Sequence, residues 1–144
     1  MRTETKKRRG VKRYLAVLPG AAALVALAST PASAAQWNYD IRTTDSVPGG
    51  QAIGRVSYEG TGGGCYRAGI DGYLYDREAD GYGAIVYLRG RDCRTGKVGM
   101  IEAGYIGGNG KSTYYNTGWI GGLKDVTARV CLFKDNRDHF CRTA

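Results

Sequence analysis

The chain has 144 residues and a formal net charge of +8, which by itself would suit a nucleic-acid or membrane binder. The charge is concentrated at the N-terminus, where residues 1–34 hold seven of the 21 basic residues and one of the 13 acidic ones. The other 110 residues carry 14 basic and 12 acidic side chains, about +2, and such a balanced surface creates no field that would gather polyanions. We therefore expect no nucleic-acid partner.

Residues 1–34 have the three zones of a secretory signal peptide. A basic segment ending at Arg13 precedes an apolar run from Tyr14 to Ala28, and Ala32 and Ala34 fit the small-residue rule for signal peptidase. The apolar run is shorter than the roughly 20 residues that a membrane-spanning helix needs, which argues against an uncleaved anchor. Arg8-Arg9 leaves the twin-arginine route open beside the favoured general secretory route. We predict cleavage after Ala34, no later membrane attachment, and a secreted, extracellular domain of residues 35–144.

The exported part is rich in glycine and tyrosine and contains a single proline, Pro48. This composition, without an amphipathic helix pattern or a repeat of fixed period, is typical of strands joined by tight turns. Strand-like segments occur at 51–59, 97–106 and 112–117, in addition to two hairpins. We predict an all-β fold, a small antiparallel β-sandwich or barrel of about six or seven strands, in a monomer.

The first predicted hairpin consists of segments 69–75 and 82–88 around the turn-rich stretch 76–81, which ends in Asp-Gly. With the turn centred on residue 79, Ile70 lies opposite Leu88, and the pairs that follow make one face consistently apolar. The second predicted hairpin joins 126–132 to 139–142 around Asn136.

All four cysteines lie in the exported part: Cys65, Cys93, Cys131 and Cys141. An even count in a small exported chain favours disulfides over metal ligands or nucleophiles. The hairpin registers place Cys65 opposite Cys93 and Cys131 opposite Cys141, at Cα separations of roughly 4.5–5.5 Å, which a disulfide accepts. We predict these two bonds. The first register also places Arg67 opposite Arg91, an unfavourable like-charge pair that a bulge would separate.

The segment Ala79-Asp80-Gly81-Tyr82-Gly83, followed by an apolar strand, occurs together with a late strand Ala128-Arg129-Val130-Cys131. This combination resembles a loose group of small secreted actinobacterial β-domain proteins of uncharacterised function. The resemblance covers about residues 50–141. It implies export and a β domain, and it carries over no catalytic residue.

The stretch Asp76-x-Glu78-x-Asp80-Gly81 is similar to the start of a calcium-binding loop. It departs from that pattern at its third position, and Tyr87 stands at the twelfth, where a bidentate glutamate is needed. A hairpin turn explains the same residues, because Asp-Gly supplies a left-handed position and the acids keep the turn soluble. We therefore predict no metal and no cofactor.

Catalytic chemistry has few candidates. The serines at 46, 57 and 112 lie in no nucleophile motif, and the cysteines are predicted to be oxidised. Glu102, His139 and Arg129 form a nominal ribonuclease set, but exposed strand and turn positions account for the same residues. The sequence favours a domain with no catalytic residues. A small secreted hydrolase or ribonuclease ranks third among the candidate functions, after the two binding functions described next.

Aromatic residues favour a binding function. Tyr73, Tyr75 and Tyr87 are predicted to share the non-core face of the first hairpin. Further aromatics in Gly- and Asn-rich segments are Trp37, Tyr114, Tyr115 and Trp119. Aromatic faces on a rigid sheet suit protein partners or stacked sugar rings. Burial of these tyrosines under a second sheet is the competing interpretation. We expect an extracellular protein partner, with the domain acting for example as an inhibitor or antagonist of competing cells, and a polysaccharide as the alternative.

Overall fold

The computed structural model describes residues 34–43, 49–108 and 110–144. Apart from Ala34, the predicted signal peptide lies outside these residues, so it stays a prediction. Ser46 and Pro48 also lie outside the described residues. Every regular element in the described part is a strand, and that part contains no helix long and apolar enough to cross a membrane. The predicted all-β fold is confirmed, with eight strands in place of six or seven.

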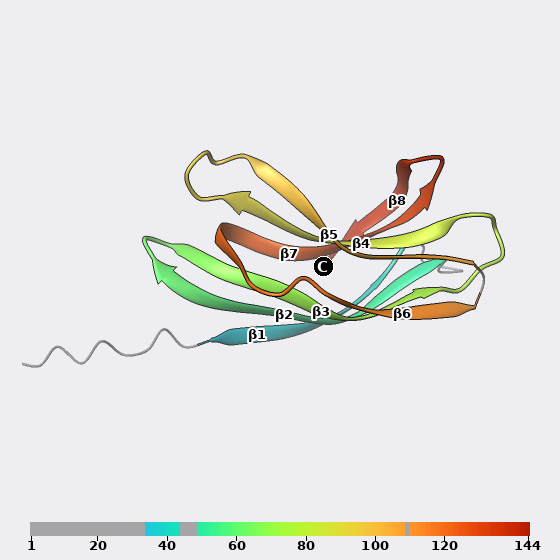
Figure 1. Ribbon diagram of the computed structural model, residues 1–144, viewed down its shortest axis with the longest axis horizontal. Coiled ribbons are helices and arrows are strands. Elements are labelled where there is room, and N and C mark those ends of the chain that lie inside the picture. The colour runs from blue at the N-terminus through green and yellow to red at the C-terminus, as the bar shows by residue number, and fades with distance from the viewer. Residues whose placement is uncertain (1–33, 44–48, 109) are drawn as a thin grey trace, which may run out of the picture.

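The strands form one antiparallel sheet that folds over into two layers (Figure 1). Hydrogen-bonded neighbours follow the order β1-β2-β3-β7-β4-β5, while β6 pairs with β3 and β8 with β7. The first layer consists of β1, β2, β3 and β6, and the second of β4, β5, β7 and β8. The bounds are β1 (Ala35–Arg42), β2 (Gly50–Gly62), β3 (Cys65–Asp76), β4 (Gly83–Asp92), β5 (Val98–Gly107), β6 (Lys111–Asn116), β7 (Ile120–Lys134) and β8 (Arg137–Thr143).

The predicted hairpin between 69–75 and 82–88 is wrong. β3 pairs with β2, β6 and β7, whereas β4 pairs with β5 and β7, so the two segments belong to different layers. The apolar face predicted for each segment is nevertheless the face that is buried: Ile70 and Leu74 on β3, and Val86 and Leu88 on β4, all lie in the core. Alternation along a strand identifies the face that is buried. The opposite layer can cover that face, so two strands with matching apolar faces need not be hydrogen-bonded neighbours.

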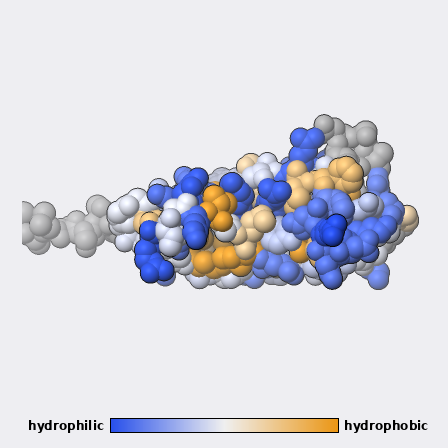
Figure 2. All heavy atoms as spheres, turned by 90° about the horizontal axis from the view of Figure 1, so that it is seen from above, coloured by the Kyte–Doolittle hydropathy of each residue, from blue (hydrophilic) through white to orange (hydrophobic). Residues whose placement is uncertain are grey.

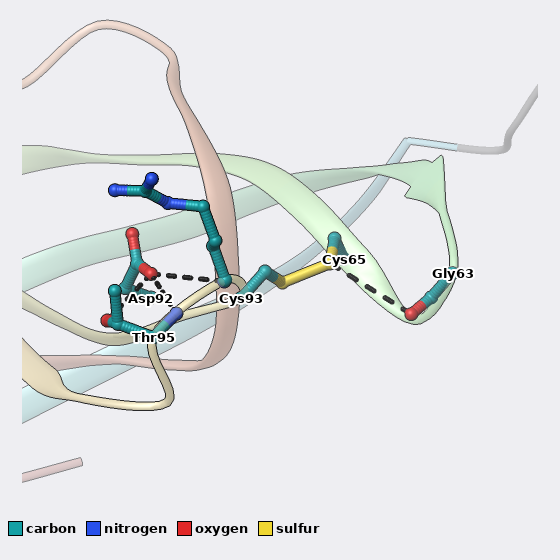
Figure 3. Close-up of a disulfide and its surroundings, with 6 residues drawn as sticks. Gly63, Cys65, Asp92, Cys93 and Thr95 are labelled. Carbon is teal, nitrogen blue, oxygen red and sulfur yellow. Dashed lines mark hydrogen bonds between the residues drawn. A yellow bond between two sulfur atoms is a disulfide. The ribbon is translucent and has the colours of Figure 1, made fainter.

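Both predicted disulfides are confirmed, the first in a different setting. Cys65 begins β3 and Cys93 follows β4, so their bond joins the two layers across a Cα distance of 6.1 Å (Figure 3). The Cys93 N–H donates to the Gly122 carbonyl at 2.8 Å. The Asp92 carboxylate accepts a hydrogen bond of 2.6 Å from the Thr95 N–H, which holds the turn that presents Cys93. These hydrogen bonds fix the backbone at the Cys93 end of the disulfide.

The like-charge contact expected between Arg67 and Arg91 does not arise, because β3 and β4 are not paired. Arg67 instead forms an ion pair with Glu59. Arg91 forms one with Asp125 at 3.1 Å. The two cations thus have separate partners.

The second predicted hairpin exists, and it is tighter than expected. Asp135 and Asn136 form a two-residue turn in which both φ angles are positive, 52° and 58°, the geometry that matches strand twist. A register shift between Val130 and Leu132, with Phe140 at φ 44°, then brings Cys141 opposite Cys131. The bulge therefore reconciles a two-residue turn with the predicted disulfide.

Two buried tyrosines, Tyr39 of β1 and Tyr115 of β6, share a hydrogen bond between their hydroxyls inside the core. Burial is the main cause that raises the pKa of Tyr39 from 10.0 to about 12, and it also raises the pKa of Tyr115. Within the described residues, this bond gives each hydroxyl the other as its side-chain partner.

The stability of the protein is expected to fall at alkaline pH because of this pair. The folded state holds the Tyr39 and Tyr115 protons more tightly than the unfolded chain does. Their contribution is therefore fully present below about pH 10 and is lost as the pH rises through about 12. Urea unfolding at about pH 8 and about pH 11.5 measures the loss. The double variant Tyr39→Phe/Tyr115→Phe should lose less stability over this range, and an equal loss would contradict the assignment.

Candidate functional site

The structure divides the predicted tyrosines between the two layers. Tyr73 and Tyr75 lie on the outer side of β3, away from the core. Tyr87 lies on β4 in the second layer, where its hydroxyl donates to the Asp138 carboxylate at 2.8 Å. The predicted common face of all three is therefore wrong, because it depended on the absent hairpin. Tyr73 is 52% exposed, so the competing interpretation of burial under a second sheet does not apply to it.

The register of the first layer places three exposed side chains in one cross-strand row. Ile53 of β2 lies opposite Tyr73 of β3, and Tyr73 lies opposite Tyr114 of β6. Ile53 is 40% and Tyr114 55% exposed. The Tyr73 and Tyr114 rings meet edge to face, with centroids 5.5 Å apart and an interplanar angle of 66°. This row is a continuous group of exposed large side chains on three neighbouring strands of the first layer.

Next to this row lies a polar one. Arg55 of β2 and Asp71 of β3 are directly opposite, and the Arg55 guanidinium donates to the Asp71 carboxylate at 2.9 Å. Beyond them, Trp119 is 51% exposed, and the Arg67 guanidinium lies 5.1 Å from the centre of its ring. A hollow of about 270 Å³ separates Trp119 from the Arg55–Asp71 pair.

The Tyr75 ring is packed against Arg77, which begins a series of polar contacts. The Arg77 guanidinium lies 4.8 Å from the centre of the Tyr75 ring and donates to the Gln51 side chain at 2.6 Å. Gln51 in turn donates to the Asp40 carboxylate at 2.6 Å. That hydrogen bond is the main cause that holds the pKa of Asp40 below its usual value. We call Ile53, Tyr73, Tyr75, Tyr114 and Trp119 together the aromatic face.

A cleft of about 670 Å³ lies away from the aromatic face, between the loop after β3, the end of β5 and the β7–β8 turn. Tyr82, Tyr105 and Phe133 supply aromatic walls, and Glu78 and Asn136 supply polar groups. The Tyr105 and Phe133 rings meet edge to face at 5.5 Å. The cleft can therefore hold a small polar molecule with an apolar side.

A third exposed group consists of Val98, Met100 and Ile101 on β5. Figure 2, which looks onto the second layer, shows hydrophobic residues in separate patches among hydrophilic ones. In the register of the second layer, Arg89 of β4 lies opposite Met100 and Arg91 lies opposite Val98.

The nominal catalytic set is only partly brought together. Glu102 and Arg129 both lie opposite Tyr87, in one row across β5, β4 and β7. His139 lies on β8, opposite Leu132 of β7. The centres of the His139 and Tyr82 rings are 5.4 Å apart. An acid–base pair needs its members within hydrogen-bond reach of a common substrate, and the structure places His139 outside the Glu102–Arg129 row.

Sulfur and carboxylate groups also meet at Cys131, Asp138 and Cys141. The two cysteines are joined to each other, so they offer no thiolate to a metal ion. This cluster is explained by the disulfide and by the hydrogen bond from Tyr87 to Asp138.

Ile53 of the aromatic face was not predicted from sequence, and Tyr114 was predicted only as one of several further aromatics. Their segments were predicted as strands, but their places beside Tyr73 depend on which strands flank β3 and in what register. No family model, curated protein or solved structure matches the chain.

Proposed function

We propose that the chain is a secreted, disulfide-stabilised, non-catalytic domain that binds an extracellular protein through the aromatic face. The observation that carries the proposal is the exposed row Ile53–Tyr73–Tyr114. Tyr75 continues it on β3, and Trp119 lies across a hollow from the neighbouring Arg55–Asp71 pair. Tyrosine, tryptophan and arginine dominate the binding energy of protein interfaces. The two disulfides and the predicted signal peptide support an oxidising, extracellular destination.

The aromatic face is organised before binding. Its tyrosines stand on paired strands, and Arg77 and Arg67 pack against the rings of Tyr75 and Trp119. Side chains already held in place lose less conformational entropy when a partner binds. A pre-organised, shallow surface of this kind suits the broad contact area of a protein partner.

Ring geometry favours a protein over a flat polysaccharide on this face. A sugar chain stacks best on rings that lie in a common plane, whereas Tyr73 and Tyr114 are inclined by 66° and Tyr73 and Tyr75 by 36°. Inclined rings instead present edges and hydroxyls to an irregular protein surface.

The double variant Tyr73→Ala/Tyr114→Ala is expected to lose partner binding by at least about 10-fold, which corresponds to about 1.4 kcal/mol. Wild-type and variant proteins are immobilised and incubated with individual purified extracellular proteases and with the secreted proteins of competing bacteria. The matched control is Tyr105→Ala, which removes an exposed tyrosine from the second layer.

Retention of one partner by wild type and Tyr105→Ala, but not by the double variant, supports the proposal. Equal retention by all three proteins contradicts it. Because Tyr73 and Tyr114 are exposed, thermal unfolding of the double variant should stay close to that of wild type, which separates lost binding from lost folding.

A carbohydrate-binding module is the second candidate, and the 670 Å³ cleft is the observation that favours it. If the cleft binds sugar, the test variant and the control variant exchange roles. Retention on insoluble chitin or cellulose should be lost in Tyr105→Ala and kept in Tyr73→Ala/Tyr114→Ala. Failure of wild type to bind either polymer would leave the cleft without support as a site for these sugars.

A further inference from the structure

A hollow of about 290 Å³ is lined by three aromatic side chains and one carboxylate. Its lining residues are Trp37, Tyr58, Tyr66, Asp125 and Val126. The aromatic members come from β1, β2 and β3 of the first layer, and the other two come from β7 of the second. None of these residues belongs to the aromatic face, and none lines the 670 Å³ cleft. The hollow is therefore a separate feature of the surface.

Strand alternation places the aromatic side chains of the hollow on the core side of the first layer. Tyr58 comes two residues after buried Val56 on β2, and Tyr66 comes two residues before buried Ala68 on β3. Trp37 of β1 and Tyr58 also pack against the buried core. Since all three aromatic side chains are only partly buried, the core ends here in rings that remain accessible.

The rings are held in place by their neighbours. The Tyr58 and Tyr66 rings are nearly perpendicular, with an interplanar angle of 82° and centroids 5.4 Å apart. The Trp37 ring meets the buried Tyr39 ring edge to face, with centroids 5.8 Å apart. Side chains already held in place lose little conformational entropy when a ligand binds. The aromatic walls are thus organised before binding.

A bulge in β7 turns two consecutive side chains toward the hollow. Between Arg89 and Arg91 the β4–β7 register shifts by one residue, so that Asp125 and Val126 together stand opposite Gly90. Asp125 has a positive φ of 53°. Successive residues of a regular strand point to opposite faces, whereas a bulge redirects a side chain. The bulge therefore explains why both Asp125 and Val126 line the hollow.

The Arg91 guanidinium holds the Asp125 carboxylate at the hollow. It donates to one Asp125 oxygen at 3.1 Å and to the Gly96 carbonyl at 2.8 Å. A primary ammonium or guanidinium ligand needs several hydrogen-bond acceptors, and here it would compete with Arg91 for the carboxylate. A quaternary ammonium group has no N–H, so it needs the negative faces of aromatic rings instead.

We propose that the hollow binds a quaternary ammonium group, as in choline. A cation within about 6 Å of an aromatic ring centre is attracted by the ring face, and tryptophan attracts it most strongly. Trp37, Tyr58 and Tyr66 supply such rings, and the Asp125 carboxylate at the same hollow disfavours an anionic ligand. With few ring contacts and a partly open site, the dissociation constant for choline is expected to be about 1 mM.

Isothermal titration of the full chain tests the site directly. Choline chloride is compared with 3,3-dimethylbutanol, which has the same shape but a carbon atom in place of the charged nitrogen; choline should bind at least about 10-fold more tightly. This comparison needs no variant, so it does not depend on whether a substituted protein folds. The absence of choline binding, or equal affinity for the two compounds, would overturn the proposal.

Substitutions locate the site within the fold. Trp37→Leu and Tyr66→Leu keep an apolar side chain but remove a ring, and each should weaken choline binding at least about 5-fold. Tyr66→Phe keeps the ring and should stay within about twofold of wild type. The matched control is Phe140→Ala, which removes an exposed aromatic ring from β8 and should bind like wild type. Unchanged affinity in both leucine variants would contradict the assignment.

Flotation with phosphatidylcholine vesicles distinguishes the two sources of a choline group. Flotation that free choline suppresses would identify a lipid headgroup, whereas choline binding without flotation would identify a free compound. The double variant Tyr73→Ala/Tyr114→Ala should bind choline like wild type, because its residues lie outside the hollow. The result therefore does not bear on the aromatic face, whose own variants are read out by partner retention.

Discussion

Gly54→Ala is expected to destabilise the protein by about 3 kcal/mol or more, since overpacking costs roughly 1–3 kcal/mol and a lost buried hydrogen bond adds to it. A Cβ at Gly54 would lie 2.2 Å from the Asp71 carbonyl oxygen and 2.7 Å from the Tyr115 hydroxyl. Backbone cannot yield that space without separating β2 from β3. The Tyr39 hydroxyl, 3.0 Å from the same Cβ position, would move as well. Urea unfolding monitored by far-UV circular dichroism measures the loss.

Gly99→Ala is the matched control. Gly99 lies on exposed β5, and a Cβ there would meet nothing within 4 Å. Its free energy of unfolding should therefore stay within about 0.5 kcal/mol of wild type. If the two substitutions were equally harmful, the cause would be the loss of glycine itself and not the close packing at Gly54.

Replacement of the Cys65–Cys93 bond by two serines is the second change with a large expected effect. The bond spans 28 residues and joins β3 to the turn after β4, that is, one layer to the other. On the chain-entropy account such a loop contributes about 3.6 kcal/mol, which lowers Tm by on the order of 15 °C in a domain of this size. Thermal unfolding of Cys65→Ser/Cys93→Ser measures it.

The other disulfide provides the comparison. Cys131–Cys141 spans 10 residues within the single hairpin β7–β8, so Cys131→Ser/Cys141→Ser should cost about 2.7 kcal/mol. A larger loss there than at Cys65–Cys93 would show that the hairpin bond has a role beyond closing a loop. Reduction of wild type should cost at least as much as the larger of the two.

The disulfide pairing was predictable from sequence even though the hairpin from which it was first argued does not exist. Residues 76–82 reverse the chain direction between β3 and β4, so Cys65 and Cys93 return to the same end of the fold whether the strands pair side by side or face each other across the core. Chain reversal and alternation are local properties, and they determine strand position, inward face and the β7–β8 turn. These local properties do not determine which strands are hydrogen-bonded neighbours within a layer.

The aromatic face shows the consequence of that limit. Sequence alone marked Tyr73, Tyr75 and Trp119 as candidates and determined the all-β class and both disulfide pairs. Only the tertiary structure separated Tyr87 from them and placed Ile53 and Tyr114 beside Tyr73, because those neighbours come from non-local pairing of β2, β3 and β6. Burial of Asp76 is likewise decided by where β2 and the loop after β3 meet, which no spacing along the chain records.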